Sequence, residues 1–507
     1  MNRILAFLLL GLVWACQKPQ KAPIPLEELT ISQIHQGYQN GDFSSEELTQ
    51  AYLDRIHAWD SLTNSISFIH PEALSQARAL DEEFAKTGKL RPLHGIPLIV
   101  KDNINTLGLP TTAGALALAD FYPETDAFII QKLKDAGAII LAKSNMAEWA
   151  FSPMHSESST LGTTRNPYHL DHVPAGSSGG TGAAVAANFG TIGLGTDTGN
   201  SIRGPSSHHA LVGFRTTLGL VSREGIVPLY LRNDVVGPMC RTVEDAVRVL
   251  QVIAGLDPKD PITANSQGKI PADYLQSLQK EDLKGSRIGV FRTLSEADPD
   301  PEISALFEKA IADLKSLGAT LIDSVEVENF DSLRRNQWCP VFREDLEKFL
   351  ADYVKRDTMS TLEDVIRVGT KSDYARNGLQ RFVEPNLPEN MDQDCGDPFT
   401  DLKRIAFREV IEKVMDSLQL DALIYPSWNH PPALIKRFQE EYKGDNSQII
   451  SPHTGQPAFT VPMGFTAKGL PAGLQFLGKM WSEPTLIRLT YAYEQGTLHR
   501  KPPALTQ

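Results

Sequence analysis

Helix-type and strand-type stretches of apolar residues alternate along the chain. Leu48, Tyr52 and Ile56 share one helical face, and Ser44 and Glu47 form a capping box ahead of them. Runs that are apolar at nearly every position are typical of strands buried on both faces of a sheet. The pattern predicts further helices at 71–85, 126–136, 181–189 and 243–254, and strands at 95–101, 138–142, 191–196, 288–291, 423–426, 458–462 and 473–478. This alternation indicates an α/β fold, a mixed twisted β-sheet covered by helices on both faces.

The segment 300–420 differs from the rest of the chain. It is richer in charge and in helical spacing, and it has no glycine between Gly318 and Gly369. We expect helices there that lie over the core and line the substrate entrance. Because no internal repeat occurs and no clear linker follows residue 26, a single domain over 26–500 is predicted.

The N-terminus has the pattern of an export signal. Arg3 precedes the apolar run from Ile4 to Ala15, which is too short to span a bilayer comfortably. Cys16 follows at once, and residues 13–16 resemble a bacterial lipobox, although Trp14 stands where a smaller residue is preferred. We therefore expect a signal peptide at 1–15, lipidation at Cys16 and a tether over 16–25. A plain secretory signal that happens to precede a cysteine is the alternative.

The residue after Cys16 bears on the destination of such a lipoprotein. In Gram-negative bacteria an aspartate at that position is the familiar cue for retention in the inner membrane, and Gln17 stands there instead. The sequence thus predicts an exported cell-envelope lipoprotein, on the periplasmic side of or at the outer membrane. Oligomeric state stays open.

Composition narrows the partners and cofactors. The 507 residues carry a net charge of −13 and contain no Lys/Arg-rich block, so nucleic acid is not an expected partner. The cysteines Cys16, Cys240, Cys339 and Cys395 are too few and too scattered to indicate a disulfide framework, and no CxxC pair occurs. The histidines lack a spacing typical of metal ligands, so no metal is expected.

Residues 175–203 hold eight glycines, with serines near both ends of the run. Glycine lets backbone approach backbone or ligand closely, and a serine on such a turn can expose its hydroxyl and the neighbouring N–H groups. Nucleophilic attack on a carbonyl needs both. The helix-forming stretch 183–187 distinguishes the run from a flexible linker.

Three side chains are candidates for this chemistry: Lys101, Ser177 and Ser201. A serine hydroxyl needs a base, and lysine can serve when desolvation keeps its amine neutral. Lys101 follows an apolar run, so its surroundings are expected to be apolar; the alternative is a strand-end lysine whose ammonium reaches solvent. The N–H groups around Thr198, Gly199 and Asn200 could form an oxyanion hole, or Ser201 could simply cap a surface turn.

Three motifs in order resemble the amidase signature family. They are Gly95-Ile96-Pro97 with Lys101-Asp102, then Gly176-Ser177-Ser178-Gly179-Gly180, then Gly199-Asn200-Ser201-Ile202-Arg203-Gly204-Pro205. The resemblance implies the amidase-signature fold and hydrolysis of carboxamides without metal or organic cofactor. It places Ser201 as nucleophile, Ser177 as bridging serine after a cis Gly176–Ser177 peptide, and Lys101 as base. Asn200 stands where the family commonly has a second glycine.

Other functions are weighed against this one. Residues 176–180 also fit the nucleophile elbow of α/β-hydrolases, with Ser178 as nucleophile, but that motif needs a strand before it and Pro174 argues against one. A match to the S-x-x-K motif at Ser277–Lys280 lacks its companion motifs. A glutaminase-type subunit of a tRNA-dependent amidotransferase conflicts with the export signal. A non-catalytic amide-binding lipoprotein would be expected to lack one of the three candidate residues.

The sequence leaves the substrate open. Peptide amidases, which some bacteria export, are the favoured comparison, so a small-molecule or peptide amide is the expected substrate. Fatty amides, aryl amides and C-terminal peptide amides are all possible, as are primary and secondary amides.

Overall fold

The centre of the molecule is an 11-stranded mixed sheet. The computed structural model describes residues 23–279, 283–339, 341–383 and 395–505. Across the sheet the strands lie in the order β1 (Ile66–Ile69), β3 (Ala138–Ser144), β2 (Ile96–Lys101), β6 (Ile192–Asp197), β8 (Val235–Cys240), β7 (Val212–Arg215), β12 (Ala458–Phe465), β13 (Pro471–Leu477), β11 (Ala422–Pro426), β9 (Arg287–Val290) and β10 (Thr320–Ile322). β2 runs parallel to both β3 and β6, which brings the ends of these strands to one edge.

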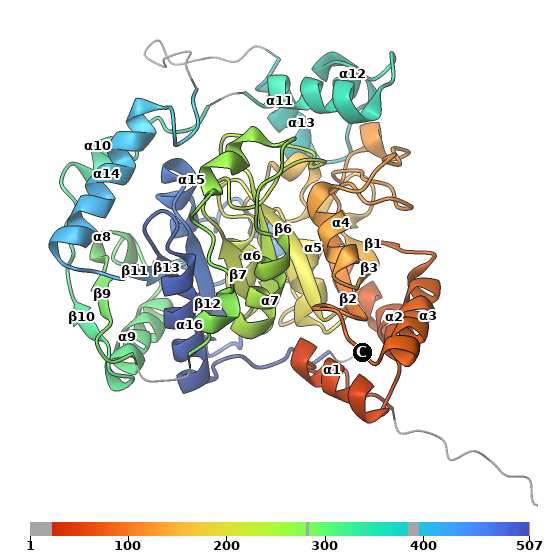
Figure 1. Cartoon of the computed structure of the whole chain (residues 1–507). Helices are drawn as coiled ribbons and strands as arrows, with labels where there is room; N and C mark the ends of the chain where they lie inside the picture. Colours follow the sequence, from red (N-terminus) through yellow and green to blue (C-terminus); the bar gives the residue numbers. More distant parts are fainter. Residues whose placement is uncertain (1–22, 280–282, 340, 384–394, 506–507) are drawn as a thin grey trace, which may run out of the picture.

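Helices cover both faces of this sheet, so the predicted fold class is confirmed (Figure 1). They are α1 (Ile31–Asn40), α2 (Ser45–Thr63), α3 (Ala73–Thr87), α4 (Phe128–Asp135), α5 (Gly179–Ala186), α6 (Arg203–His208), α7 (Val243–Ile253), α8 (Arg292–Ser295), α9 (Pro301–Ser316), α10 (Phe330–Leu333), α11 (Phe342–Phe349), α12 (Leu362–Val368), α13 (Asp373–Gln380), α14 (Leu402–Ser417), α15 (Ser451–Thr454) and α16 (Glu483–Thr497). A two-stranded ribbon of β4 (Glu157–Ser158) and β5 (Gly162–Thr163) lies apart from the main sheet.

The predicted elements match the observed ones closely where their apolar pattern is continuous. The capping box of Ser44 and Glu47 begins α2, and every strand predicted from the pattern is present. The pattern missed β1, β4, β5, β7, β8 and β10. β8 contains Gly237 and Pro238, residues that ordinarily interrupt a central strand, and β10 has only three residues.

Within 300–339, 341–383 and 395–420, the regular elements are helices as expected, apart from β10. Its helices α11, α12 and α13 lie together at one end of the molecule, in the turquoise part of the ribbon (Figure 1). α13 and the turn after it reach the cavity described below. This part of the segment therefore lines the cavity, and its role as a substrate entrance stays a prediction.

The two ends of the described chain meet beside α1. Arg500 forms an ion pair with Glu28 at 2.6 Å, and the C-terminus lies next to α1 in the ribbon (Figure 1). The predicted signal peptide, Cys16 and the tether up to residue 22 lie outside the described residues. Within the described ranges, no helix has the length and apolar character needed to cross a bilayer. The single domain over 26–500 stays a prediction.

One disulfide bond joins Cys339 to Cys395, whose Cα atoms lie 5.8 Å apart. The conclusion that the cysteines carry no disulfide framework was thus wrong for this pair. The two residues are 56 positions apart and belong to segments that meet only through the tertiary fold, so sequence spacing contained no signal for them. Cys240 is a buried free thiol.

Candidate active site

Lys101 ends β2 in a fully buried position. Its Nζ donates hydrogen bonds to Ser177 Oγ at 2.7 Å and to Thr196 Oγ1 at 2.8 Å, on the neighbouring strand β6. Burial lowers the pKa of Lys101 to about 7, although the charges of Asp197 and Asp234 act in the opposite direction. The alternative of a lysine that reaches solvent is therefore wrong, and a large share of Lys101 is neutral near pH 7.

Ser177 follows a cis Gly176–Ser177 peptide, as the resemblance implied. A Cβ on Gly176 would lie 2.2 Å from the Ser152 carbonyl oxygen, so only glycine fits there. Ser178 next to it donates its hydroxyl to the Thr196 carbonyl at 3.2 Å, and the segment before the two serines is not a strand. The geometry thus disagrees with the nucleophile-elbow interpretation of Ser178.

Ser201 lies in the turn between β6 and α6 and is 4% exposed. Thr198, Gly199, Asn200 and Ser201 all line one cavity. Within the part of the chain that the structure describes, no backbone carbonyl accepts a hydrogen bond from the N–H groups of residues 199–201. Free N–H groups on a turn are what an oxyanion hole requires. The Ser201 hydroxyl donates to Asn200 Oδ1 at 3.4 Å.

The buried Asp197 carboxylate fixes the conformation of this turn through hydrogen bonds. Its Oδ2 accepts hydrogen bonds from the Ile202 N–H at 3.1 Å and from Arg203 Nε at 3.1 Å, and its Oδ1 accepts one from Arg215 Nη1 at 2.9 Å. Arg203 also donates to the Gly199 carbonyl at 2.6 Å. Arg203 belongs to the third motif of the sequence, whereas nothing in the sequence singled out Arg215 or Thr196.

Replacing Asp197 by asparagine is expected to destabilise the fold by about 3–5 kcal/mol, because two buried guanidinium groups would lose their counter-charge. Burial alone would raise the pKa of Asp197, but the charges of Arg203 and Arg215 outweigh it and hold the pKa at about 2. Since the pKa is lowered on folding, the carboxylate stabilises the fold at neutral pH, and this contribution is lost as the pH falls through about 2. Urea denaturation measures the change.

The matched control for that experiment is Asp331→Asn, which removes the exposed Arg334–Asp331 ion pair. Exposed pairs contribute about 0–1 kcal/mol, so this variant should unfold close to the wild-type urea concentration. If Asp197→Asn also unfolded close to the wild-type urea concentration, Asp197 would not have this anchoring role.

The cavity in front of Ser201 has a volume of about 300 Å³, at the lower end for small-molecule sites. Its aromatic walls are Phe151, Tyr230, Trp338, Tyr374 and Phe382, and its polar side chains include Asn377, Gln439, Gln448 and Arg381. Trp338 and Gln448 come closest to the turn, since a Cβ on Gly199 would lie 3.0 Å from each. The wall residues come from segments far apart in sequence, so no local motif pointed to them.

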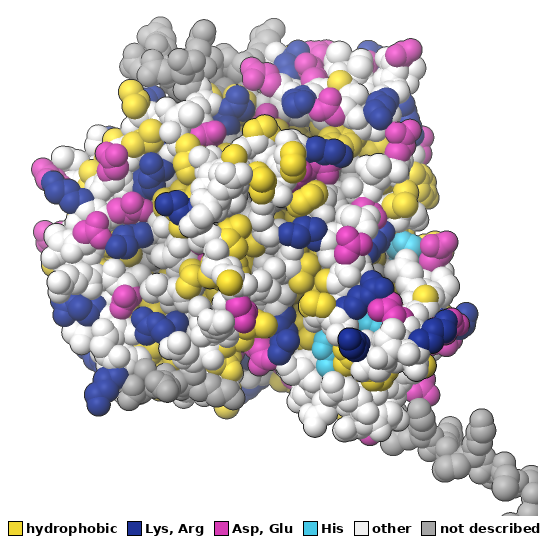
Figure 2. Space-filling view, in the orientation of Figure 1, with side chains coloured by type: hydrophobic (Ala, Val, Ile, Leu, Met, Phe, Trp, Pro, Cys, Tyr) yellow, Lys and Arg dark blue, Asp and Glu magenta, His cyan; other side chains and the backbone are white. Residues whose placement is uncertain are grey.

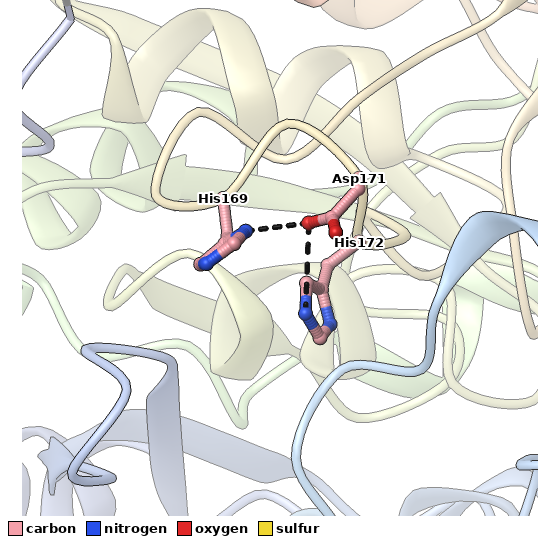
Figure 3. A group of neighbouring side chains, drawn as sticks. All are labelled: His169, Asp171 and His172. Carbon is pink, nitrogen blue, oxygen red and sulfur yellow. Dashed lines mark hydrogen bonds and ion pairs between the residues drawn. The ribbon is translucent and has the colours of Figure 1, made fainter.

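The histidines do not form the metal-ligand spacing sought in the sequence, yet the fold brings His169, Asp171 and His172 together on one loop (Figure 3). Their ligand-type atoms all lie within 4.8 Å of one another. The His169 and Asp171 side chains already bond to each other at 2.5 Å, and His172 Nδ1 bonds to the Pro432 carbonyl at 2.7 Å. These hydrogen bonds account for the arrangement, and we assign it no metal.

His208 and His209 are both buried. Burial lowers the pKa of each to about 3, so both are neutral. His209 Nδ1 bonds to the Pro205 carbonyl at 2.7 Å, whereas neither ring nitrogen of His208 has a partner within the described ranges. The His208 ring packs beside the ring of Trp428.

A buried lysine bonded to a serine after a cis peptide, with a second serine on a glycine turn, defines an amide-hydrolysing enzyme. The chain belongs to the Amidase family, whose profile matches residues 47–487. It is 33% identical to a probable amidase of Arabidopsis thaliana, covering 94% of this chain and 92% of the relative. It is 35% identical to a glutamyl-tRNA(Gln) amidotransferase subunit of Microcystis aeruginosa, covering 94% and 99%.

Solved structures agree with this assignment. The native peptide amidase of Stenotrophomonas maltophilia superposes with a TM-score of 0.84 at 34% identity, covering 95% of this chain and 100% of that one. An amidase family protein of Bacillus anthracis gives a TM-score of 0.83 at 31% identity, covering 95% and 93%. With an amide-hydrolysing family shown, the hypothesis of a non-catalytic amide-binding lipoprotein is set aside.

Proposed function

We propose that this amidase works through a covalent acyl-enzyme on Ser201, with Ser177 and Lys101 as the proton relay. The observation that carries the proposal is the 2.7 Å contact between the buried Lys101 Nζ and Ser177 Oγ. Neutral Lys101 accepts the Ser177 proton while Ser177 takes the proton of Ser201, and Ser201 Oγ attacks the amide carbon. The N–H groups around Thr198, Gly199, Asn200 and Ser201 bind the oxyanion.

The relay then runs in reverse. Lys101 returns the proton through Ser177 to the leaving nitrogen, which departs as ammonia or an amine, and water hydrolyses the acyl-enzyme. Every proton in this cycle moves between groups of the chain, the substrate and water.

We take a peptide or other small primary amide as the substrate. Support comes from the likeness to peptide amidases, one of which was solved with the competitive inhibitor chymostatin at 36% identity. The experiment is a panel of peptide, aryl and fatty amides given to the purified mature chain, with release of ammonia or amine as the readout. If the enzyme hydrolyses none of these amides, the proposal is wrong.

The glutaminase-type subunit of a tRNA-dependent amidotransferase stays the alternative, because relatives of that kind match the chain at a similar identity. The same panel with glutamine added separates the two functions. An independent amidase hydrolyses its substrates without a partner chain, whereas a glutaminase subunit would be confined to glutamine and depend on partners.

We also propose that the enzyme is exported and lipid-anchored through Cys16. Support comes from Arg3, the apolar run at 4–15 and Cys16 in the sequence, and from the Cys339–Cys395 disulfide, since such bonds persist mainly in oxidising compartments. On the face seen in Figure 2, acidic and basic side chains are interspersed without a basic block. Attachment to the envelope would therefore depend on the lipid rather than on that face.

Cys16→Ala is expected to block processing or to release the protein from membranes, because several acyl chains on one cysteine anchor a protein stably. Membrane fractionation with an antibody against the mature chain measures this. Gln17→Asp is the matched variant: it keeps the lipid, so the protein should stay in membranes but shift to the inner membrane. Recovery of the wild-type chain in the cytosol with residues 1–15 intact would refute the anchor.

A further inference from the structure

Among the described residues that line the cavity in front of Ser201, one carries a charge. It is Arg381, which lies in the turn after α13 at the exposed rim. The same described lining contains neither an aspartate nor a glutamate. The whole chain has the opposite character, with a net charge of −13. The local charge of the cavity therefore contrasts with that of the protein.

Arg381 has no ion-pair partner among the residues that the structure describes. Arg376, five residues earlier, differs from Arg381 because it has an ion-pair partner. Arg376 is bound to Asp373 at 2.5 Å and to the Thr370 carbonyl at 3.1 Å, so its charge is already compensated. Because no carboxylate among the described residues compensates the Arg381 guanidinium, its donors are open to a ligand, and carboxylates match its planar geometry.

The position of Arg381 relative to the aromatic walls is also defined. Burial raises the pKa of the Tyr230 and Tyr374 hydroxyls. The positive charge of Arg381 lowers both pKa values by a smaller amount. Both tyrosines line the same cavity as Ser201. Arg381 is exposed whereas Ser201 is 4% exposed, so the guanidinium lies on the solvent side of the cavity and the nucleophile turn lies deeper inside.

We propose that Arg381 is an anion-binding subsite that selects amides with a carboxylate on their acyl portion, such as peptides whose amidated C-terminal residue is acidic. The inference rests on the proposed function, because hydrolysis of a primary amide releases only ammonia. Everything else in the substrate then belongs to the acyl portion and occupies the cavity between Ser201 and the rim. An acidic side chain on that portion would meet the guanidinium.

The test compares three dipeptide amides, N-acetyl-alanyl-glutamate amide, -methionine amide and -lysine amide. Methionine is neutral and of similar length to glutamate. Wild type is expected to have a kcat/KM about tenfold higher for the glutamate amide than for the methionine amide, as one charge-assisted contact provides. Arg381→Gln should abolish that ratio, and Arg381→Glu should favour the lysine amide. Conversion to the free acid is followed by mass spectrometry.

Arg376→Gln is the control, since it removes a neighbouring arginine outside the cavity and should keep the wild-type ratio. A second measurement separates the subsite from the chemistry. Binding of the same peptides to Ser201→Ala protein, with and without Arg381→Gln, is measured by calorimetry. If Arg381 governs a preference for the acidic peptide in binding while wild type hydrolyses nothing, the subsite holds and the proposed function fails. Equal binding of the glutamate and methionine peptides would overturn the subsite.

Discussion

Ser201→Ala is expected to lower kcat for amide hydrolysis by about 10⁴- to 10⁶-fold, because loss of a nucleophile removes most of the rate enhancement. The alanine leaves the turn, the N–H groups of residues 199–201 and the cavity in place, so substrate binding should persist. Steady-state kinetics on the best amide of the panel measures the loss. A fluorophosphonate probe followed by peptide mass spectrometry should label Ser201 in the wild type.

The control is Ser178→Ala, which removes a hydroxyl that donates to the Thr196 carbonyl rather than facing the nucleophile turn. This variant should still be labelled on Ser201. If the probe labelled Ser178 in the wild type, Ser201 would lose its role and the nucleophile-elbow interpretation would return.

Lys101→Met should lower the rate of amide hydrolysis by a factor approaching that of Ser201→Ala, since the relay loses its base while the buried methylenes are retained. In the wild type, kcat/KM should rise with pH through about 7, the pKa to which burial lowers Lys101. The sign follows from the role: the protonated ammonium cannot accept a proton, so activity falls below that pH. Measurement of kcat/KM from about pH 5 to about pH 9 gives the profile.

Ester substrates separate activation of the nucleophile from protonation of the leaving group. An alkoxide leaves with little need of a proton, so Lys101→Met should damage ester hydrolysis less than amide hydrolysis. Lys86→Met, at an exposed position on α3, should keep both activities and the pH profile. Near-normal amidase activity in Lys101→Met protein would show that Lys101 is not the base.

Local sequence predicted the strands that carry the site better than it predicted the site's surroundings. β2 is a continuous apolar run up to Lys101, and a run of that kind indicates burial directly, whereas β6 alternates glycine with Ile192 and Leu194 before it ends in Thr196 and Asp197. Lys101 could be placed at the end of its strand for that reason, and Ser201 in the glycine-containing turn that follows β6. The bond from Lys101 to Thr196 depends on the parallel register of β2 and β6, which no local pattern encodes.

The walls of the cavity were beyond sequence reasoning for a related reason. Trp338, Tyr374 and Gln448 come from three segments that meet only in the folded chain. Lys143 illustrates the same limit. Like Lys101 it is fully buried on a strand, but its Nζ donates to the Ile104 carbonyl at 2.6 Å and so is occupied elsewhere. Only the spatial contacts distinguish the two lysines.

The Cys339–Cys395 bond has a consequence for how the enzyme is produced. Cys339 follows Trp338, whose ring lies against the nucleophile turn, so the bond fixes the chain next to that wall. Recombinant protein made in a reducing cytoplasm would carry two thiols there instead. We expect such a preparation to fold with a less constrained cavity wall and a higher KM. The thiol content of each batch therefore has to be measured before kinetic constants from different expression hosts are compared.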